Sequence, residues 1–186
     1  MTLKNRRSLM VLAFAALICV MGAFRYNLTS TDVPVTLQNL FVLLAACLIG
    51  PLQGSAATGI FLVLGILGLP VFSGFHGGIE YFTGQTGGYL TGYFIAAFLT
   101  GSIIGRPSLL IKTSILKLIL SVISGMLVIY VFGLFRYMKF NSMDFSDISQ
   151  AIDLCIIPFL PGDAIKTAVI TALAKVLRPY FAKWFF

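Results

Sequence analysis

Charged residues are scarce in this chain of 186 residues: they make up 10% of it, against roughly 25% in an ordinary soluble domain. Hydrophobic residues make up 59%, and the mean hydropathy is +0.99. A soluble protein of this size exposes too much surface to hide so many apolar side chains, and a disordered chain would need low hydrophobicity. Both classes are excluded, and the sequence predicts an all-α integral membrane protein.

Residues that usually hold metals or carry hydrolytic chemistry are also few. The single histidine, His76, excludes a zinc site of the His-Glu-x-x-His kind. The cysteines lie in apolar runs at spacings that suit neither a disulfide framework nor zinc; they are Cys19, Cys47 and Cys155. The chain contains no phosphate-binding loop and no Gly-x-Ser-x-Gly nucleophile motif. We therefore expect no enzyme, no metal site and no cofactor.

The apolar residues fall into six runs separated by short glycine-, proline- or charge-containing segments. A membrane-spanning helix needs about 20 residues, so a chain of this length has room for roughly six or seven crossings. No room is left for an ATPase domain. We expect one six-helix membrane domain over residues 1–186. The predicted helices cover residues 9–24, 37–49, 54–69, 88–104, 109–135 and 152–177.

The charges that remain are distributed unevenly between the two sides of such a bundle. There are 13 basic and 6 acidic residues, and most basic ones lie at the chain ends and in the loops of one side. The positive-inside rule then places both termini in the cytoplasm of a bacterial inner membrane and makes nucleic acid an improbable partner. The acidic loop residues all fall outside: Asp32, Glu80, Asp144 and Asp147. The basic exceptions outside are Arg25, Arg136 and Lys139.

Two ionisable residues lie inside the last apolar run. Asp163 and Lys166 follow Pro161-Gly162, which indicates a helix that restarts, with both side chains on one helical face. Because charges at such depth are costly, they usually face a cavity or each other. The pair is therefore a candidate ligand site, and an ion pair that only orders the helix is the alternative.

Other polar side chains lie near the same outer ends of the predicted helices. They are Thr36 and Gln38 before the second helix, and Gln85, Thr86 and Tyr89 before the fourth. Together with aromatic rings of the glycine-rich segment between Phe72 and Gly87, they suit a small ligand that is partly polar and partly apolar. Gln38 and Tyr89 could equally be interfacial residues.

Small residues recur every four positions in the first predicted helix, at Ala15, Cys19 and Ala23. Such a stripe permits close approach of another helix. It indicates either internal packing or a docking surface for a partner protein.

Several of these segments resemble the BioY family, the biotin-binding S-components of energy-coupling-factor (ECF) vitamin transporters. The resemblance rests on four segments: Val33-Pro-Val-Thr-Leu-Gln38, Gly68-Leu-Pro-Val-Phe72, Thr86-Gly-Gly-Tyr-Leu90 and Pro158-Phe-Leu-Pro-Gly-Asp-Ala-Ile-Lys166. It implies the S-component fold, with an extracellular glycine-rich loop over an outward-facing pocket. It also implies docking through the first helix onto a transmembrane coupling protein that carries ATPase subunits, which alone would use ATP.

The resemblance assigns Asp163 and Lys166 to the biotin-binding site. Biotin has a ureido ring with two N–H donors and a carbonyl acceptor, and a valerate tail that ends in a carboxylate. Asp163 can accept from the ureido nitrogens, and Lys166 can donate to the ureido oxygen or to the carboxylate. Phe72, Phe75 and Tyr89 are expected to cover the apolar ring and tail.

The sequence leaves two other functions open. The chain could be a self-sufficient vitamin transporter or channel that needs no ATPase. An intramembrane enzyme is the weaker alternative, because no nucleophile–base pair or metal constellation is present.

Overall fold

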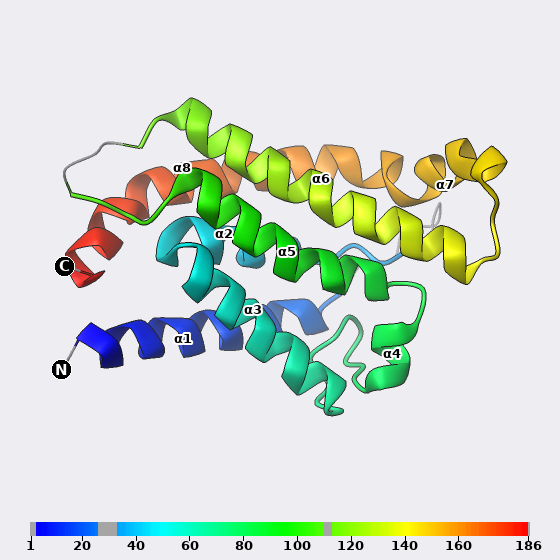
Figure 1. Ribbon diagram of the computed structural model, residues 1–186, viewed down its shortest axis with the longest axis horizontal. Coiled ribbons are helices and arrows are strands. Elements are labelled where there is room, and N and C mark those ends of the chain that lie inside the picture. Colours follow the sequence, from blue (N-terminus) through cyan, green and yellow to red (C-terminus); the bar gives the residue numbers. More distant parts are fainter. Residues whose placement is uncertain (1–2, 26–32, 110–112, 186) are drawn as a thin grey trace.

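The structure is a computed structural model that describes residues 3–25, 33–109 and 113–185. Its helices form one bundle (Figure 1) in the order α1 (Leu3–Ala23), α2 (Gln38–Ile49), α3 (Pro51–Ile66), α4 (Ile79–Thr83), α5 (Gly87–Ile104), α6 (Ile115–Phe140), η1 (Phe145–Asp147), α7 (Ile148–Cys155), η2 (Ile157–Phe159) and α8 (Leu160–Phe185). Each of the first five predicted apolar ranges overlaps one of these helices, whereas the last, 152–177, spans the end of α7, η2 and most of α8. Asp32, for which the sequence predicted a place in an outer loop, is not among the described residues.

Four of the helices are long and apolar enough to cross a membrane. They are α1, α5, α6 and the α7–α8 segment, whereas α2 and α3 are apolar but shorter. Nearly every residue of α2 is buried, so α2 lies at the centre of the bundle, where neighbouring helices surround it. The structure therefore confirms a membrane protein of apolar helices, and six crossings stay a prediction.

Proline and glycine set the helix boundaries near the site. Gly50 adopts a φ of +87° between α2 and α3, and Pro51 is the first residue of α3, a position where its missing N–H costs nothing. Pro158 lies in the short turn η2 between α7 and α8, and α8 begins at Leu160. Asp163 is therefore in the first turn of α8, as the sequence predicted. The end of α6 differs from the prediction, which placed it at residue 135. The helix continues to Phe140, and Tyr137 and Met138 in the added turn are buried.

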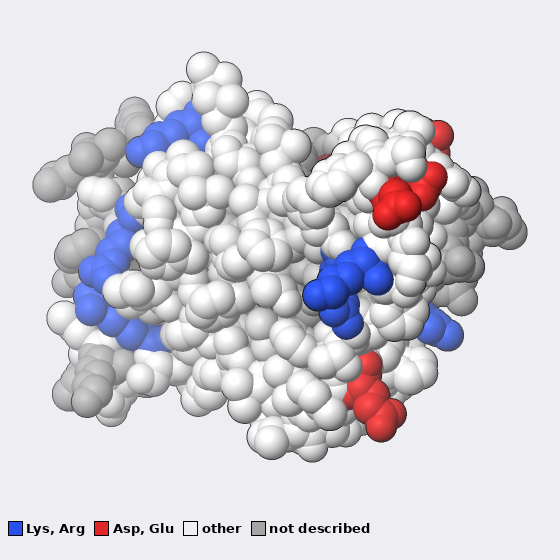
Figure 2. All heavy atoms as spheres, turned by 45° about the vertical axis from the view of Figure 1, so that its right-hand side comes forward, with Lys and Arg blue, Asp and Glu red and all other residues white. Residues whose placement is uncertain are grey.

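The two described ends of the chain lie at the same end of the bundle, and α4 and α7 lie at the opposite end (Figure 1). On the face in Figure 2, acidic atoms occur only at the α4–α7 end, where some basic atoms lie among them. Other basic atoms gather at the far end, and the broad middle carries no charge. This distribution is the one a membrane protein shows, with a charge-free belt between two polar ends.

A buried arginine holds the end of the bundle that carries the termini. Arg178 of α8 is 4% exposed and donates to the carbonyl oxygen of Cys47 near the end of α2. It also donates to the carbonyls of Gly105 and Arg106, at 3.0 and 3.1 Å, and to Thr113 Oγ1 at 3.0 Å. A cation at the carboxyl ends of α2 and α5 is favoured by their dipoles, so Arg178 joins three helices.

Replacing Arg178 by methionine is expected to lower the stability of the protein in detergent by at least about 2 kcal/mol, because several buried carbonyl oxygens lose their donor. Ligand binding by the folded fraction should not change, since Arg178 lies at the end of the bundle opposite the candidate site described below. Thermal unfolding of the variant and of Lys183→Met, an exposed basic residue of the same helix, checks this. Equal stabilities of the two variants would contradict it.

Candidate functional site

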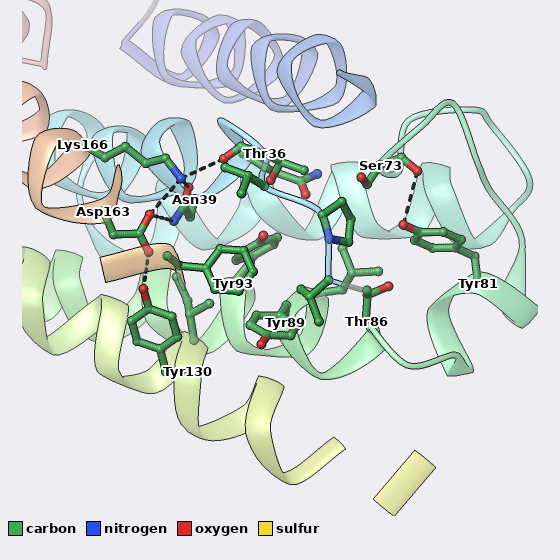
Figure 3. A pocket seen from close by; sticks show the side chains of 17 residues that line it. Thr36, Asn39, Ser73, Tyr81, Thr86, Tyr89, Tyr93, Tyr130, Asp163 and Lys166 are labelled. Carbon is green, nitrogen blue, oxygen red and sulfur yellow. Dashed lines mark hydrogen bonds and ion pairs between the residues drawn. The ribbon is translucent and has the colours of Figure 1, made fainter. Parts of the chain in front are cut away.

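A cavity lies between the helices at the α4–α7 end of the bundle (Figure 3). Its empty volume is about 580 Å³ with the open space at its mouth included. Residues from α2, α4, α5, α6, η2 and α8 and from the segments before α2, α4 and α5 line it. They are Val33, Pro34, Val35, Thr36, Gln38, Asn39, Ser73, Tyr81, Thr86, Tyr89, Leu90, Tyr93, Ile129, Tyr130, Phe159, Asp163 and Lys166.

The carboxylate of Asp163 is held by donors from three helices. Its Oδ1 accepts from Lys166 Nζ at 2.8 Å and from Asn39 Nδ2 at 3.1 Å. Its Oδ2 accepts from the hydroxyl of Tyr130 at 2.5 Å. A carboxylate offers about four lone-pair positions, so one remains for a ligand. Both Asp163 and Lys166 are buried, and the pair is the ion pair that the i, i+3 spacing predicted.

Lys166 uses all three of its N–H donors on the protein itself. Besides Asp163, its Nζ donates to the backbone carbonyl of Thr36 at 2.9 Å and to Asn39 Oδ1 at 3.0 Å. Asn39 in turn completes the network, because its Nδ2 reaches Asp163. A buried polar network whose members are all satisfied is rigid. Lys166 therefore positions Thr36, Asn39 and Asp163 and neutralises the carboxylate.

The opposite end of the cavity is formed by the segment between α3 and α5 (Figure 3). The carbonyl of Ser73 accepts from the hydroxyl of Tyr81 at 3.2 Å and lies 3.0 Å from His76 Nδ1. Two polar atoms of lining residues, Ser73 Oγ and Gln38 Nε2, are buried and have no partner in the described part of the chain. Gln38 Nε2 lies close to Gly22 of α1, where a Cβ would be only 2.2 Å away. Because an unpaired buried polar group is costly, a ligand that reached either atom would be stabilised by pairing with it.

Aromatic side chains form the walls between the two ends. Tyr89 and Tyr93, one turn apart on α5, lie between Tyr130 and Thr86 in Figure 3. The hydroxyl of Tyr89 donates to the carbonyl of Cys155 at 3.0 Å, which fixes the start of α5 against the end of α7. The cavity thus offers a charged end, aromatic walls and a second polar end.

The structure brings most of the predicted site residues together. Asp163, Lys166 and Tyr89 line the cavity, and so do Thr86, Gln38 and Thr36. Thr36 contributes its backbone carbonyl to Lys166, where the sequence suggested its hydroxyl.

Three predicted residues do not line the cavity: Gln85, Phe72 and Phe75. Phe72 is fully buried and packs edge-on against Phe61 of α3, with ring centroids 5.4 Å apart. Gly65 of α3 makes this possible, because a Cβ at that position would lie 2.2 Å from the Phe72 ring. Phe75 is 61% exposed and has a φ of +61°, which turns its ring outward. The expectation that Phe72 and Phe75 cover a ligand is wrong for this structure.

Sequence reasoning missed the partners that other helices supply. Asn39 and Tyr130 bind Asp163 directly, and Tyr93 adds a wall. A signal for two of them was present: Asn39 is a polar residue in an apolar helix, and Tyr93 follows Tyr89 by one turn. Ser73 and Tyr81 lie in the glycine-rich segment, where no periodicity shows which side chains point inward.

The stripe on α1 faces the bundle. Ala15 is 2% and Ala23 is 5% exposed, and Cys19 is half-buried. The side of α1 that faces away carries the large apolar residues Leu12 and Val20 together with Ala13 and Ala16. A docking surface must be accessible to its partner, so the interpretation of Ala15, Cys19 and Ala23 as such a surface is wrong. The small residues instead allow α1 to pack closely on its neighbours.

Comparison with known proteins gives one family throughout. The sequence profile of the BioY family matches residues 1–183. The chain is 36% identical to the probable biotin transporter BioY of Pyrococcus horikoshii, over 95% of this chain and 98% of that protein. It is also 36% identical to the biotin transporter BioY of Thermotoga maritima, over 89% and 91%. A crystal structure of the S-component for biotin from an ECF-type ABC transporter superposes with a TM-score of 0.84, at 27% identity, over the full length of both chains.

Proposed function

The chain belongs to the BioY family, and we propose that it is the biotin-binding S-component of an ATP-driven ECF-type importer. The observation that carries the proposal is the cavity whose charged end is built from Asp163 and Lys166. It lies in a membrane bundle at the end opposite both termini (Figures 1 and 3). A cavity in that position suits capture of a small solute from one side of the membrane.

In the proposed pose, biotin lies along the cavity from its charged end to its second polar end. A ureido N–H donates to the open lone-pair position of Asp163, whose other positions are occupied by Lys166, Asn39 and Tyr130. This assigns Asp163 to direct contact and Lys166 to positioning, because the three N–H groups of Lys166 already have acceptors. The thioether ring and the tail then lie along Tyr93 and Tyr89, where burial of apolar surface supplies much of the affinity.

The valerate carboxylate is assigned to the other end of the cavity. Gln38 Nε2 and Ser73 Oγ are the two buried polar atoms of lining residues that lack a partner in the described structure, and Gln38 is only 2% exposed. Both can donate to a carboxylate oxygen, and hydrogen bonds to a charged group are stronger than those between neutral groups. Their pairing with the carboxylate would remove the cost of burying them alone.

Replacing Gln38 by leucine is expected to weaken binding of biotin by about tenfold, through loss of a charge-assisted hydrogen bond. Binding of biotin amide, which lacks the carboxylate charge, should change much less. Equilibrium titration of both ligands measures this, with Gln53→Leu, outside the cavity lining, as the matched control. An equal loss for both ligands would contradict the assignment of Gln38 to the carboxylate.

In the membrane, we place one domain over residues 1–186 with six crossings, both termini in the cytoplasm and the glycine-rich segment outside. The charge-free belt between the basic end and the acid-containing end supports this orientation (Figure 2). The shorter helices α2 and α3 are accommodated because α2 is surrounded by protein, so it need not match the thickness of the lipid.

The orientation predicts which side of the membrane a new cysteine faces. In a variant without the native cysteines, Glu80→Cys in the exposed α4 should react with an impermeant thiol reagent in intact cells. Lys183→Cys near the end of α8 should react only after the cells are opened. The reverse pattern would overturn the orientation.

ATP hydrolysis falls to separate subunits, because the chain contains no phosphate-binding loop. A transmembrane coupling protein and ATPase subunits would convert captured biotin into uptake. The alternative is a transporter that works alone. Uptake of labelled biotin in a host without its own biotin transporter separates the two: we expect accumulation only when the coupling and ATPase subunits are produced together with the chain. Equal uptake by the chain alone would establish the alternative.

A further inference from the structure

A second hollow lies on the other side of the first turns of α5, separate from the biotin cavity. This outer groove has an empty volume of about 670 Å³, with adjoining open space included, and runs between α4, α5 and the end of α6. Its lining residues are Phe82, Thr83, Gly87, Gly88, Thr91, Phe132, Phe135, Arg136 and Lys139. None of them lines the biotin cavity.

The polar end of the outer groove is cationic. Arg136 and Lys139 are three residues apart on α6 and therefore lie on one helical face. Arg136 donates through Nε to the carbonyl of Gly84 at 3.1 Å, which fixes its guanidinium above the end of α4. Within the described residues the ammonium of Lys139 has no acceptor, and no carboxylate belongs to the lining. Two cations thus converge without a counter-charge from the groove.

The rest of the outer groove is apolar and faces outward. Phe132 and Phe135 are exposed on α6, and Phe82 of α4 adds a third ring. At the floor of the groove Gly88 lets α5 approach α6 closely: a Cβ there would lie 2.2 Å from the carbonyl oxygen of Phe132. The groove therefore changes from apolar to cationic along α6, toward the end of that helix.

We propose that the outer groove binds one anionic phospholipid of the leaflet that faces the α4 end. Its phosphate lies between Arg136 and Lys139, and an acyl chain lies along Phe132 and Phe135. The charge of the groove and its apolar part both match such a lipid, whereas a soluble anion would leave the aromatic rings of the groove without a partner. Basic residues near a membrane surface attract anionic lipids, which also gives a reason for two cations on the side where the positive-inside rule expects few. The proposal requires a membrane location but not biotin binding.

Native mass spectrometry of the purified chain in detergent tests the proposal, with phosphatidylglycerol and phosphatidylcholine of the same chains as probes. The wild type should retain phosphatidylglycerol in preference to phosphatidylcholine. Lys139→Gln should lower its affinity for phosphatidylglycerol about fivefold, and Arg136→Gln together with Lys139→Gln about 25-fold. The matched control is Lys117→Gln, an exposed lysine at the opposite end of the same helix, which should leave the preference intact.

The single variant Lys139→Gln keeps the test valid even if loss of the Arg136 bond to Gly84 impairs folding, because the Lys139 side chain bonds to no other residue that the structure describes. Biotin binding of each variant reports that the bundle is intact. Unchanged phosphatidylglycerol affinity in Lys139→Gln and in the double variant would overturn the proposal. So would equal retention of both lipids by the wild type, or displacement of the lipid by inorganic phosphate at similar concentration, which would show a site for the anion alone.

Discussion

The variant Asp163→Asn is expected to bind biotin at least about tenfold more weakly than the wild type. Its amide oxygen can still accept from Lys166 and Asn39, but the new NH₂ group then takes the place of the oxygen that meets the Tyr130 hydroxyl. A ureido N–H of biotin would face a donor in place of an acceptor, and each buried polar group left unpaired costs roughly 1–3 kcal/mol. Since about 1.4 kcal/mol corresponds to a factor of ten, the loss is measurable by titration.

The matched control for this variant is Asp153→Asn, the same substitution at an exposed position of α7. Binding is measured on the folded fraction, so that a loss of stability is not counted as a loss of affinity. If Asp163→Asn unfolds more easily but its folded fraction binds biotin as the wild type does, the pair serves only to order α8.

The variant Lys166→Met is expected to show the larger loss of stability, about 3–5 kcal/mol, because it leaves the buried Asp163 carboxylate without its counter-charge. The carbonyl of Thr36 and the side-chain oxygen of Asn39 also lose their donor. Biotin affinity should fall at least about tenfold, since the carboxylate is no longer held in place. Thermal unfolding and titration measure the two effects, with the exposed Lys175→Met as the control on the same helix.

A double variant separates the positioning role of Lys166 from the direct role of Asp163. Combining Asp163→Asn with Lys166→Met removes both charges, so part of the stability lost in Lys166→Met should return. Biotin affinity should stay low, because the acceptor for the ureido group is still missing. Recovery of affinity together with stability would show that Asp163 does not contact the ligand.

The sequence predicted the site best where its residues are close along the chain. Asp163 and Lys166 could be placed on one helical face because their spacing in a helix determines it, and Pro161-Gly162 indicated where that helix begins. The apolar runs predicted the helices because a helix that crosses the lipid needs about 20 mostly apolar residues. Those two features fix the charged end of the cavity.

The residues that the sequence did not reveal come from other helices. In a globular protein an amphipathic stripe shows which side of a helix faces inward, but α2 is apolar all round, so nothing in its sequence turns Asn39 toward Asp163. Tyr130 is one of four hydroxyl-bearing residues of α6, and nothing in the sequence shows which of them faces the cavity. Phe72 and Phe75 could not be oriented either, because the backbone turns of residues 67–78 decide which ring enters the protein.

The docking stripe shows the same difficulty in another form. Small residues at every fourth position permit close helix contact, but they do not say which helix makes it. In the structure Ala15 and Ala23 face the bundle. Their spacing correctly predicted close packing of α1, but that packing is against helices of the same chain and not against a partner protein.

The central claim is that this chain alone forms a complete biotin site. Equilibrium titration of the purified chain with radiolabelled biotin in detergent, with no coupling or ATPase subunit present, tests it most directly. We expect saturable binding to a single class of sites that unlabelled biotin displaces and that Asp163→Asn weakens, whereas Asp153→Asn does not. Absence of saturable binding to demonstrably folded chain would show that this chain does not form a biotin site by itself.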